Sequence, residues 1–223
     1  MDSFHRDEKF YTDAMNLIFD KYPDIVRFQC RIPYAGHDVT YLTYATQANE
    51  LFKQTGISIY NGISKCVLIG EDSNYVCKFP RNAMNDCQRE VEIYNQSITE
   101  GVDKYFAPCA EIGTCHNMPL YLMERMEVPD SEEVLSYSNS YYYNSYSDSD
   151  DYEEGSAWKY LCEVWGSDCL DLSVFMIKYG INDIHDENIG YDHNGILKII
   201  DYSGFHGFGY MLHTPRMESI LKF

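Results

Sequence analysis

The chain has 223 residues, a formal net charge of −18, and 45% hydrophobic and 15% aromatic residues. This length and apolar content allow a sizeable core and exclude an entirely disordered protein. The net charge argues against nucleic acid as a partner, because binding through phosphates needs clusters of Lys and Arg. No run of about eighteen apolar residues occurs and the start has no apolar signal segment, so no membrane partner is expected.

Eight cysteines are scattered along the chain without any C-x-x-C pair. Cys66 and Cys77 lie in apolar, strand-like runs, which is typical of reduced core thiols in a cytosolic protein. Cys109, Cys115 and His116 could ligate a metal, but their spacing matches no zinc motif. We therefore expect a cytoplasmic protein without a zinc site.

Two helices are predicted within residues 1–56, which would form an N-terminal helical extension. Residues 4–21 are amphipathic, and a second helical stretch covers about 45–55. The apolar residues that occur at helical spacing in the first helix are Phe10, Tyr11, Ala14, Leu17 and Ile18.

Five strands are predicted next. Three short ones cover about 57–60, 65–70 and 75–79, and two more cover 106–113 and 119–126. Together they would complete an antiparallel five-stranded sheet. A helix with regularly spaced apolar residues is predicted over 86–96, between the third and fourth strands.

Residues 127–156 form an acidic, Ser- and Tyr-rich segment. Nine Asp and Glu residues lie between Arg125 and Lys159 with no basic residue among them, and they supply half of the net charge. Low complexity and like charges predict a flexible insertion. An autophosphorylation or partner-docking loop and a solvated linker are both open interpretations.

Two helices, over 157–161 and 168–179, are predicted to be separated by a break at Gly166, with Gly180 as the C-cap of the second. The residues expected to face a core are Leu170, Val174, Phe175 and Met176.

The most informative residues follow this helix. Asp183 is followed five residues later by Asn188, and Asp201 closes an apolar strand. Phosphoryl transfer from ATP uses such a set: one carboxylate accepts the hydroxyl proton, and an amide and a carboxylate hold magnesium. Turn chemistry is the alternative for such residues, and 192–195 with its Asn-Gly pair is a predicted hairpin turn. Turn chemistry does not explain Asp201, because this residue lies outside any polar cluster.

These residues resemble the motifs of the protein-kinase-like superfamily. Residues 183–188 resemble the D-x-x-x-x-N catalytic loop, and 197–204 resemble the strand and turn that carry D-F-G. Residues 181–183 read Ile-Asn-Asp where protein kinases have H-R-D. Residues 183–185 read Asp-Ile-His and are closer to the D-L-H of aminoglycoside- and choline-type phosphotransferases.

The resemblance implies an α+β, bilobal protein-kinase-like fold. A small antiparallel five-stranded N-lobe would cover 57–126 and a truncated helical C-lobe 157–223, in addition to the extension and the acidic insertion. Only 22 residues follow Asp201 and they include no A-P-E motif, so a usual activation segment is missing. The substrate class is therefore left open.

The resemblance also implies a pair of charges in the N-lobe. Lys78 resembles the strand-three lysine that contacts the α- and β-phosphates, and Glu90 resembles its helix partner. Glu92 is the competitor, because neighbouring helix residues cannot both face Lys78. A solvated edge-strand lysine and a solvated helix carboxylate are the plain alternatives.

A glycine-rich phosphate loop is only partly present. When the chain is set against G-x-G-x-x-G-x-V, the middle glycine is Gly62, and Tyr60 and Lys65 replace the other two. Gly62 would let the backbone approach the phosphates, helped by the amide or hydroxyl of Ser64. An ordinary hairpin glycine is the alternative.

The last predicted strand resembles the strand that leads into the kinase hinge. Met123 would then be the gatekeeper, and Glu124 and Met126 would offer backbone groups to adenine. A plain core strand with a charged end explains the same residues equally well.

The implied function is an ATP- and Mg²⁺-dependent kinase. Lys78 and Glu90 would position the phosphates, Asp183 would take the acceptor proton, and Asn188 and Asp201 would hold Mg²⁺. We favour a protein Ser, Thr or Tyr hydroxyl as acceptor, in the host cytoplasm if the enzyme is encoded by a virus or is an effector.

Other function classes stay open. The Asp-Ile-His run favours a small-molecule phosphotransferase, and the charge favours an inactive pseudokinase or acidic binding protein that binds basic surfaces. A metal-dependent hydrolase that uses His185 and His193 would need more clustered ligands than the chain offers.

Overall fold

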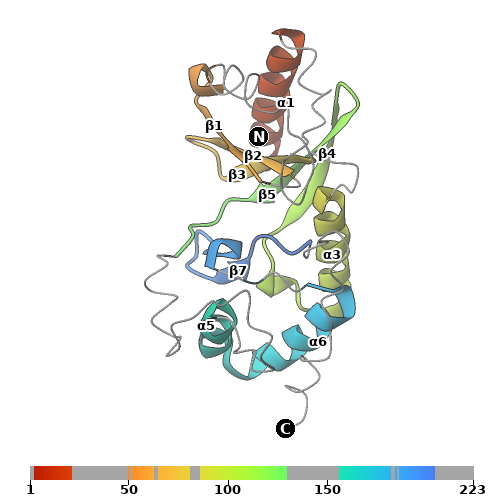
Figure 1. Ribbon diagram of the computed structural model, residues 1–223, viewed down its shortest axis with the longest axis vertical. Helices are drawn as coiled ribbons and strands as arrows, with labels where there is room; N and C mark the ends of the chain where they lie inside the picture. The colour runs from red at the N-terminus through yellow and green to blue at the C-terminus, as the bar shows by residue number, and fades with distance from the viewer. Residues whose placement is uncertain are drawn as a thin grey trace, which may run out of the picture. The chain divides into compact units, whose positions relative to one another are not determined.

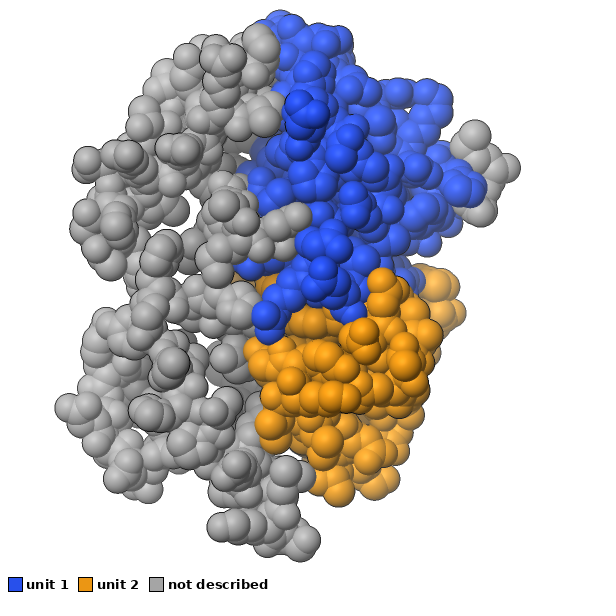
Figure 2. Space-filling model, turned by 90° about the vertical axis from the view of Figure 1, so that its right-hand side faces the viewer, with its two compact units in different colours: residues 1–92, 108–125 blue, residues 93–107, 126–223 orange. Residues whose placement is uncertain are grey.

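The structure is a computed structural model that describes residues 3–21, 50, 52–62, 65–80, 86–129, 156–181, 184 and 186–203. The chain divides into two compact units, coloured separately in Figure 2. Unit 1 comprises Met1–Glu92 and Pro108–Arg125, and unit 2 comprises Ile93–Ala107 and Met126–Phe223. Among the described residues, no helix combines the length and the apolar character needed to cross a membrane.

A five-stranded antiparallel sheet is the centre of unit 1, and it confirms the predicted sheet (Figure 1). Its strand order is β1-β2-β3-β5-β4. The strands are β1 (Ile57–Asn61), β2 (Lys65–Gly70), β3 (Tyr75–Pro80), β4 (Cys109–Cys115) and β5 (Met118–Glu124). β4 begins later than predicted because the N–H of Ala107 donates to the carbonyl of Ile199 in unit 2 instead.

One face of the sheet is covered by helix α1 (Ser3–Lys21), as Figure 1 shows. The helix buries Tyr11, Ala14, Met15, Ile18 and Phe19 against sheet residues that include Leu68, Cys77, Leu120 and Leu122. The predicted helix is present, so the start of the extension belongs to the core of unit 1. Residues 52–54 are helical and Phe52 joins the same core, whereas most of the predicted helix over 45–55 lies outside the described residues.

The predicted apolar face of α1 was partly wrong. Phe10 and Leu17 are 37% and 50% exposed, while Met15 and Phe19, which the prediction omitted, are buried. Apolar residues occupy a wide arc of this helix, so its sequence is compatible with more than one rotation. Contact with the sheet selects the rotation that buries the most apolar surface.

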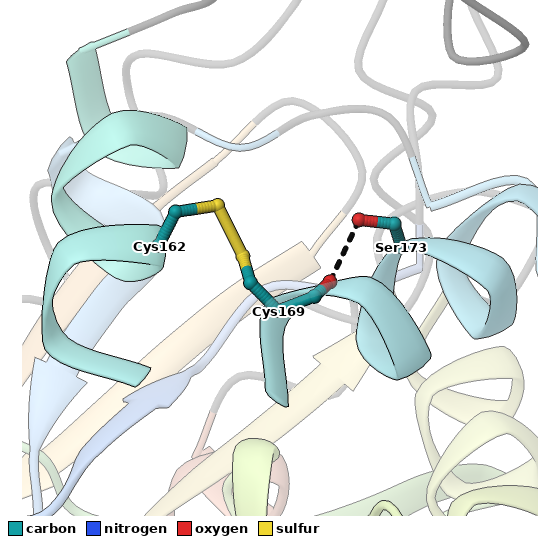
Figure 3. The surroundings of a disulfide bond; sticks show 3 residues. All are labelled: Cys162, Cys169 and Ser173. Atoms are coloured by element: carbon teal, nitrogen blue, oxygen red, sulfur yellow. Dashed lines mark hydrogen bonds between the residues drawn. A yellow bond between two sulfur atoms is a disulfide. The ribbon is translucent and has the colours of Figure 1, made fainter. Parts of the chain in front are cut away.

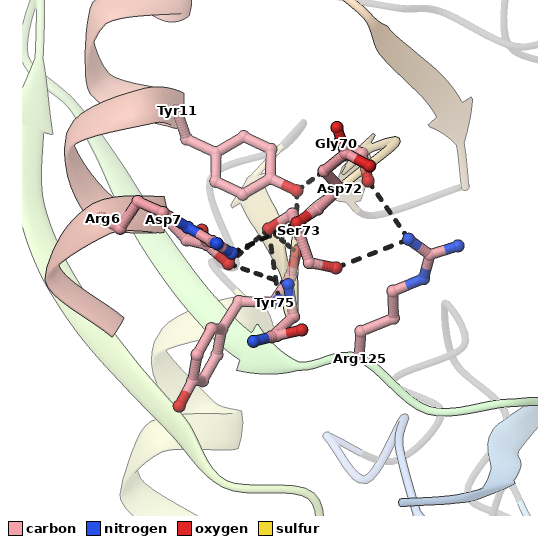
Figure 4. Close-up of polar contacts among 9 residues, drawn as sticks. Arg6, Asp7, Tyr11, Gly70, Asp72, Ser73, Tyr75 and Arg125 are labelled. Carbon is pink, nitrogen blue, oxygen red and sulfur yellow. Dashed lines mark hydrogen bonds and ion pairs between the residues drawn. The ribbon is translucent and has the colours of Figure 1, made fainter. Parts of the chain in front are cut away.

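Polar contacts fix the N-terminal half of α1 to the turn between β2 and β3 (Figure 4). The carboxylate of Asp7 accepts hydrogen bonds from Ser73 Oγ at 2.7 Å, Asn74 N–H at 2.8 Å and Arg6 Nε at 2.7 Å. Burial alone would raise the pKa of the Asp7 carboxyl, but these hydrogen bonds outweigh burial and hold the pKa below its ordinary value.

Tyr11 adds a second connection between α1 and the same turn. Its hydroxyl donates to the carbonyl of Tyr75 at 2.7 Å and accepts from the N–H of Gly70 at 2.8 Å. Arg125 donates to the carbonyl of Gly70 from the other side at 3.1 Å (Figure 4). The turn is therefore held by side chains that are distant in sequence.

Helix α3 (Asp86–Glu100) is four residues longer than predicted. It ends where Gly101 adopts a left-handed conformation, with φ of 74°, and the N–H of Val102 donates to the carbonyl of Ser97 at 2.9 Å. A glycine in this position satisfies the last carbonyl groups of a helix. Gly101 is the signal in the sequence that marks the end of α3, and the predicted end at residue 96 was too early.

In unit 2, α5 (Ser156–Trp165), a short 3₁₀ helix, η3 (Gly166–Asp168), and α6 (Cys169–Tyr179) follow one another. The break at Gly166 and the left-handed C-cap at Gly180 confirm the predictions. Phe175 and Met176 are buried as predicted, but Leu170 and Val174 are half-exposed, which corrects the predicted face. Leu170 and Val174 are four residues apart on one side of α6, and Leu172 and Cys169 are buried on the other.

A disulfide joins Cys162 of α5 to Cys169 of α6 (Figure 3). The helix break at 166–168 brings the two Cα atoms to 5.3 Å, which lies within the range of disulfide bridges. The sequence analysis predicted reduced thiols for Cys66 and Cys77 and made no prediction for this pair. The described cysteines outside this disulfide are all buried: Cys66, Cys77, Cys87, Cys109 and Cys115.

The last described element is a hairpin of β6 (Ile189–Tyr191) and β7 (Leu197–Ile199), preceded by the 3₁₀ helix η4 (Asp186–Asn188). The predicted turn at 192–195 is confirmed, because the N–H of Gly195 donates to the carbonyl of Asp192 at 2.9 Å. The Asp192 carboxylate also accepts from the N–H groups of Asn194 and Ile196. The 3₁₀ helix η2 (Asp103–Tyr105) lies next to β7.

Replacing Asp7 by Asn should lower the free energy of unfolding by about 1.5–3 kcal/mol at pH 7, the scale of hydrogen bonds to a charged group. Because the folded-state pKa is lowered, this contribution is present above the ordinary Asp pKa of about 4 and is lost as the pH falls further. Urea unfolding of both proteins from pH 7 to pH 3 measures the difference. Asp13→Asn, an exposed control on the same helix, should cost less than about 0.5 kcal/mol. A difference that stays constant with pH would contradict the assignment.

Candidate functional site

A buried cluster of three charged side chains lies on the sheet face of unit 1 opposite α1. Glu90 of α3 accepts from Lys78 Nζ of β3 at 3.0 Å and from Lys65 Nζ of β2 at 2.5 Å. The side chains of Lys65, Lys78 and Glu90 are only 8%, 6% and 0% exposed. We call these three residues the charge cluster.

The strand register explains why both lysines reach the same carboxylate. Lys78 pairs with Val67 across β2 and β3, and Val67 is two residues from Lys65 on the same strand. Residues two apart in a strand share a face, and paired residues of antiparallel strands also share one. Lys65 and Lys78 therefore point to the same side of the sheet.

The choice between Glu90 and Glu92 is resolved by the helix. Glu90 faces the two lysines, whereas Glu92 is exposed and accepts a hydrogen bond from Gln88 at 3.3 Å. Adjacent positions in a helix point in different directions, so only one of the two can face the sheet. The Tyr121 hydroxyl also donates to Gln88, at 3.1 Å, and this bond holds the start of α3 to β5.

Lys65 is the member of the charge cluster that the sequence analysis missed. It was treated there only as the residue that replaces a glycine. A signal was available in the sequence. Lys65 and Val67 are two residues apart and so share one face of an otherwise apolar strand, which indicates that Lys65 points to a covered face. Its partner could not be identified without the fold.

Two cysteines line this region and stay protonated. Burial, together with a smaller contribution from the negative charge of Glu90, raises the pKa of the Cys109 thiol to about 12. Burial likewise raises the pKa of the Cys87 thiol. Neither thiol is therefore a nucleophile at neutral pH.

The hairpin between β1 and β2 explains why residue 62 is a glycine. Its N–H donates to the carbonyl of Lys65 at 3.0 Å, and a Cβ at this position would lie 3.1 Å from the same oxygen. Close approach of the two strands thus favours glycine whether or not a ligand binds. Ser64 lies outside the described residues, so the phosphate-binding role of this loop stays a prediction.

The predicted hinge residues divide between the two units. Met123 is buried in β5, and the N–H of Glu124 donates to the carbonyl of Pro108 at 2.9 Å. Met126 belongs to unit 2, where it packs against Gly190, and a Cβ at Gly190 would lie 2.6 Å from the Met126 Cβ. The proposed contacts of Glu124 and Met126 with adenine stay a prediction.

Unit 2 brings the predicted metal ligands to one end of its hairpin. The N–H of Ile200 donates to the carbonyl of Asn188 at 2.9 Å, so Asn188 lies beside the residue that precedes Asp201. Ser203 Oγ donates to the Asp201 carboxylate at 3.4 Å, and the hydroxyl of Tyr202 donates to the carbonyl of Ala107 at 2.7 Å. The amide and carboxylate oxygens of Asn188 and Asp201 are ligand types that suit Mg²⁺.

The remaining predicted residues of this unit are Asp183 and His185, which lie outside the described residues. So does nearly all of the acidic insertion, from residue 130 to 155. Within the described part of the chain, no group of three or more His, Cys, Asp or Glu side chains gathers to hold a metal ion. Nothing there favours a metal site at Cys109, Cys115 and His116.

No protein-family model matches the chain, and no match is found among curated proteins. Among solved structures, the chain is similar to the bifunctional kinase-methyltransferase WbdD, with a TM-score of 0.33 and 18% sequence identity. The similarity covers 78% of this chain and 32% of that protein. At this level of similarity, function has to be argued from the side chains themselves.

Replacing Glu90 by Ala should destabilise the protein by about 3–5 kcal/mol, because two buried ammonium groups lose their shared carboxylate. Glu92→Ala is the matched control and should change the free energy of unfolding by less than about 0.5 kcal/mol. Urea unfolding of the two variants beside the wild-type protein gives both values. Equal effects of the two substitutions would contradict the position assigned to Glu90.

Proposed function

We propose that the protein is an ATP- and Mg²⁺-dependent phosphotransferase of the protein-kinase type. The observation that carries the proposal is the buried contact of Lys78 on β3 with Glu90 on α3. A buried ion pair adds little stability compared with an apolar pair of the same size, so stability alone gives no reason to keep one. Positioning a lysine against nucleotide phosphates gives such a reason.

Most of the residues that would bind the nucleotide belong to unit 1, and Met126 belongs to unit 2. Lys78 would donate to the oxygens of the α- and β-phosphates, and Glu90 would hold its ammonium group in place. The loop with Gly62 and Ser64 would cover the phosphates. Backbone groups of Glu124 and Met126 are proposed to bind adenine.

The residues of unit 2 would carry the chemical step. Asn188 and Asp201 would hold Mg²⁺, which neutralises charge on the phosphates when bound. The acceptor hydroxyl oxygen forms a bond to the γ-phosphorus while the bond from that phosphorus to ADP breaks. Asp183 would orient the hydroxyl and take its proton on a carboxylate oxygen.

The acceptor we favour is a Ser, Thr or Tyr hydroxyl of a protein, including a host protein if the enzyme is encoded by a virus or is an effector. A small-molecule acceptor is the second candidate, because residues 183–185 read Asp-Ile-His. A pseudokinase would bind nucleotide through the charge cluster without transferring phosphate.

Replacing Asp201 by Ala should lower phosphoryl transfer by about 10² or more while the protein stays folded, because a proposed magnesium ligand is lost. Asp171→Ala, a substitution at an exposed site on α6, should leave transfer unchanged. Transfer from labelled ATP to a panel of proteins and small molecules, with Mg²⁺ present, measures the effect. Undiminished turnover in the Asp201 variant would exclude the magnesium site.

Asp183 and Asn188 should differ in what their loss changes. Asp183→Asn keeps the shape but removes the charge, so turnover should fall by about 10² or more while ATP affinity stays within a few-fold. Asn188→Ala should instead raise the Mg²⁺ concentration that is needed for half-maximal turnover. Calorimetry of ATP binding beside turnover assays separates these effects.

ATP binding and turnover of the wild-type protein distinguish the remaining function classes. Tight ATP binding without turnover on the whole panel would favour the pseudokinase. Absence of ATP binding would overturn the proposed function.

A further inference from the structure

The backbone and the side chain of Lys65 have separate roles. It is the first residue of β2, and its carbonyl accepts from the N–H of Gly62, so its backbone closes the hairpin. Its side chain points to the face covered by α3 and contacts Glu90. The Gly62 amide, which a phosphate-binding loop would offer to a ligand, is engaged in this hairpin bond. The ammonium group of Lys65 is the cation that the same hairpin places on the covered face.

The ammonium groups of Lys65 and Lys78 converge on one atom. Glu90 Oε1 lies 2.5 Å from Lys65 Nζ and 3.2 Å from Lys78 Nζ. Two like charges so close together repel strongly where burial excludes water. Two ammonium groups from neighbouring strands therefore lie close enough together to donate to one anionic group.

Orienting Lys78 requires only one carboxylate and one lysine. A second buried lysine on the same carboxylate adds a desolvation cost of its own. A polyphosphate offsets that cost, because oxygens of neighbouring phosphate groups can accept from separate ammonium groups. Lysine suits this purpose as a compact charge on a flexible stem.

We propose that Lys65 is a second phosphate-binding cation, which together with Lys78 holds the phosphates of the bound nucleotide. This inference rests on the proposed function and adds to it a residue from β2. Charge from Lys65 takes the part that backbone amides play in a complete glycine-rich loop. Phosphate binding at this site is therefore shared by two strands.

The test compares probes with and without phosphate. Calorimetry would measure binding of ATP, inorganic tripolyphosphate and adenosine to the wild-type protein, Lys65→Met, Lys78→Met and the control Lys53→Met. Lys53 is exposed in unit 1, so its substitution removes the same charge away from the charge cluster. Lys65→Arg and Lys65→Gln serve as further variants, and thermal unfolding checks that each one folds.

Lys65→Met should weaken ATP and tripolyphosphate binding by about tenfold or more, the loss expected for one charged hydrogen bond. Adenosine binding should stay within about twofold, Lys65→Arg should retain part of the ATP affinity, and Lys53→Met should behave as wild type. If Lys65→Met does not fold, the same pattern is required of Lys65→Gln relative to Lys65→Arg.

Three results would overturn the inference. Equal losses for ATP and adenosine would mean that Lys65 only supports the local structure. Unchanged ATP binding in Lys65→Met, beside weakened binding in Lys78→Met, would remove Lys65 from the site and leave the proposed function standing. Failure of the wild-type protein to bind either ATP or tripolyphosphate would overturn both.

Discussion

The structure of unit 1 depends on one buried carboxylate. Glu90 has no exposed surface and holds ammonium groups from two neighbouring strands. A buried charge is tolerated only when it is paired and hydrogen-bonded, so these contacts determine which side of α3 faces the sheet. They also explain why lysines occur in strands whose other buried residues are apolar. Burial also makes the charge cluster suited to the proposed phosphate binding, because charges held out of water interact strongly with a charged ligand.

The two faces of the sheet are thus covered in different ways. One face buries aromatic and aliphatic side chains under α1, and the polar contacts of Asp7 and Tyr11 fix the end of that helix to the turn between β2 and β3. The other face presents the charge cluster to α3. Under the proposed function, the packed apolar face would support the charged face, because a binding site needs its side chains fixed within a fraction of an ångström.

In unit 2, a short hairpin would hold the proposed metal ligands in place. Its turn is stabilised by Asp192, whose carboxylate accepts from two backbone N–H groups beyond it. At the other end, the pairing of β6 with β7 brings Asn188 next to Ile200, the residue before Asp201, although Asn188 and Ile200 are twelve positions apart. The disulfide of Cys162 and Cys169 joins the two helices that precede this hairpin in the chain. The oxygen groups proposed to bind Mg²⁺ are in this way brought together by backbone pairing rather than by neighbouring positions in sequence.

The sequence by itself determined what local chemistry controls. The strands of the sheet, the helix break at Gly166, the cap at Gly180 and the turn at 192–195 follow from alternation of apolar residues and from glycine conformation, which act over a few residues. Tertiary structure decided which face of α1 is buried, which of Glu90 and Glu92 meets Lys78, that Lys65 joins them, and that Cys162 pairs with Cys169. Each of these depends on a contact between distant segments, and several arrangements are equally compatible with the local pattern. Only the packing of one element on another, which buries apolar surface and pairs buried charges, selects among them.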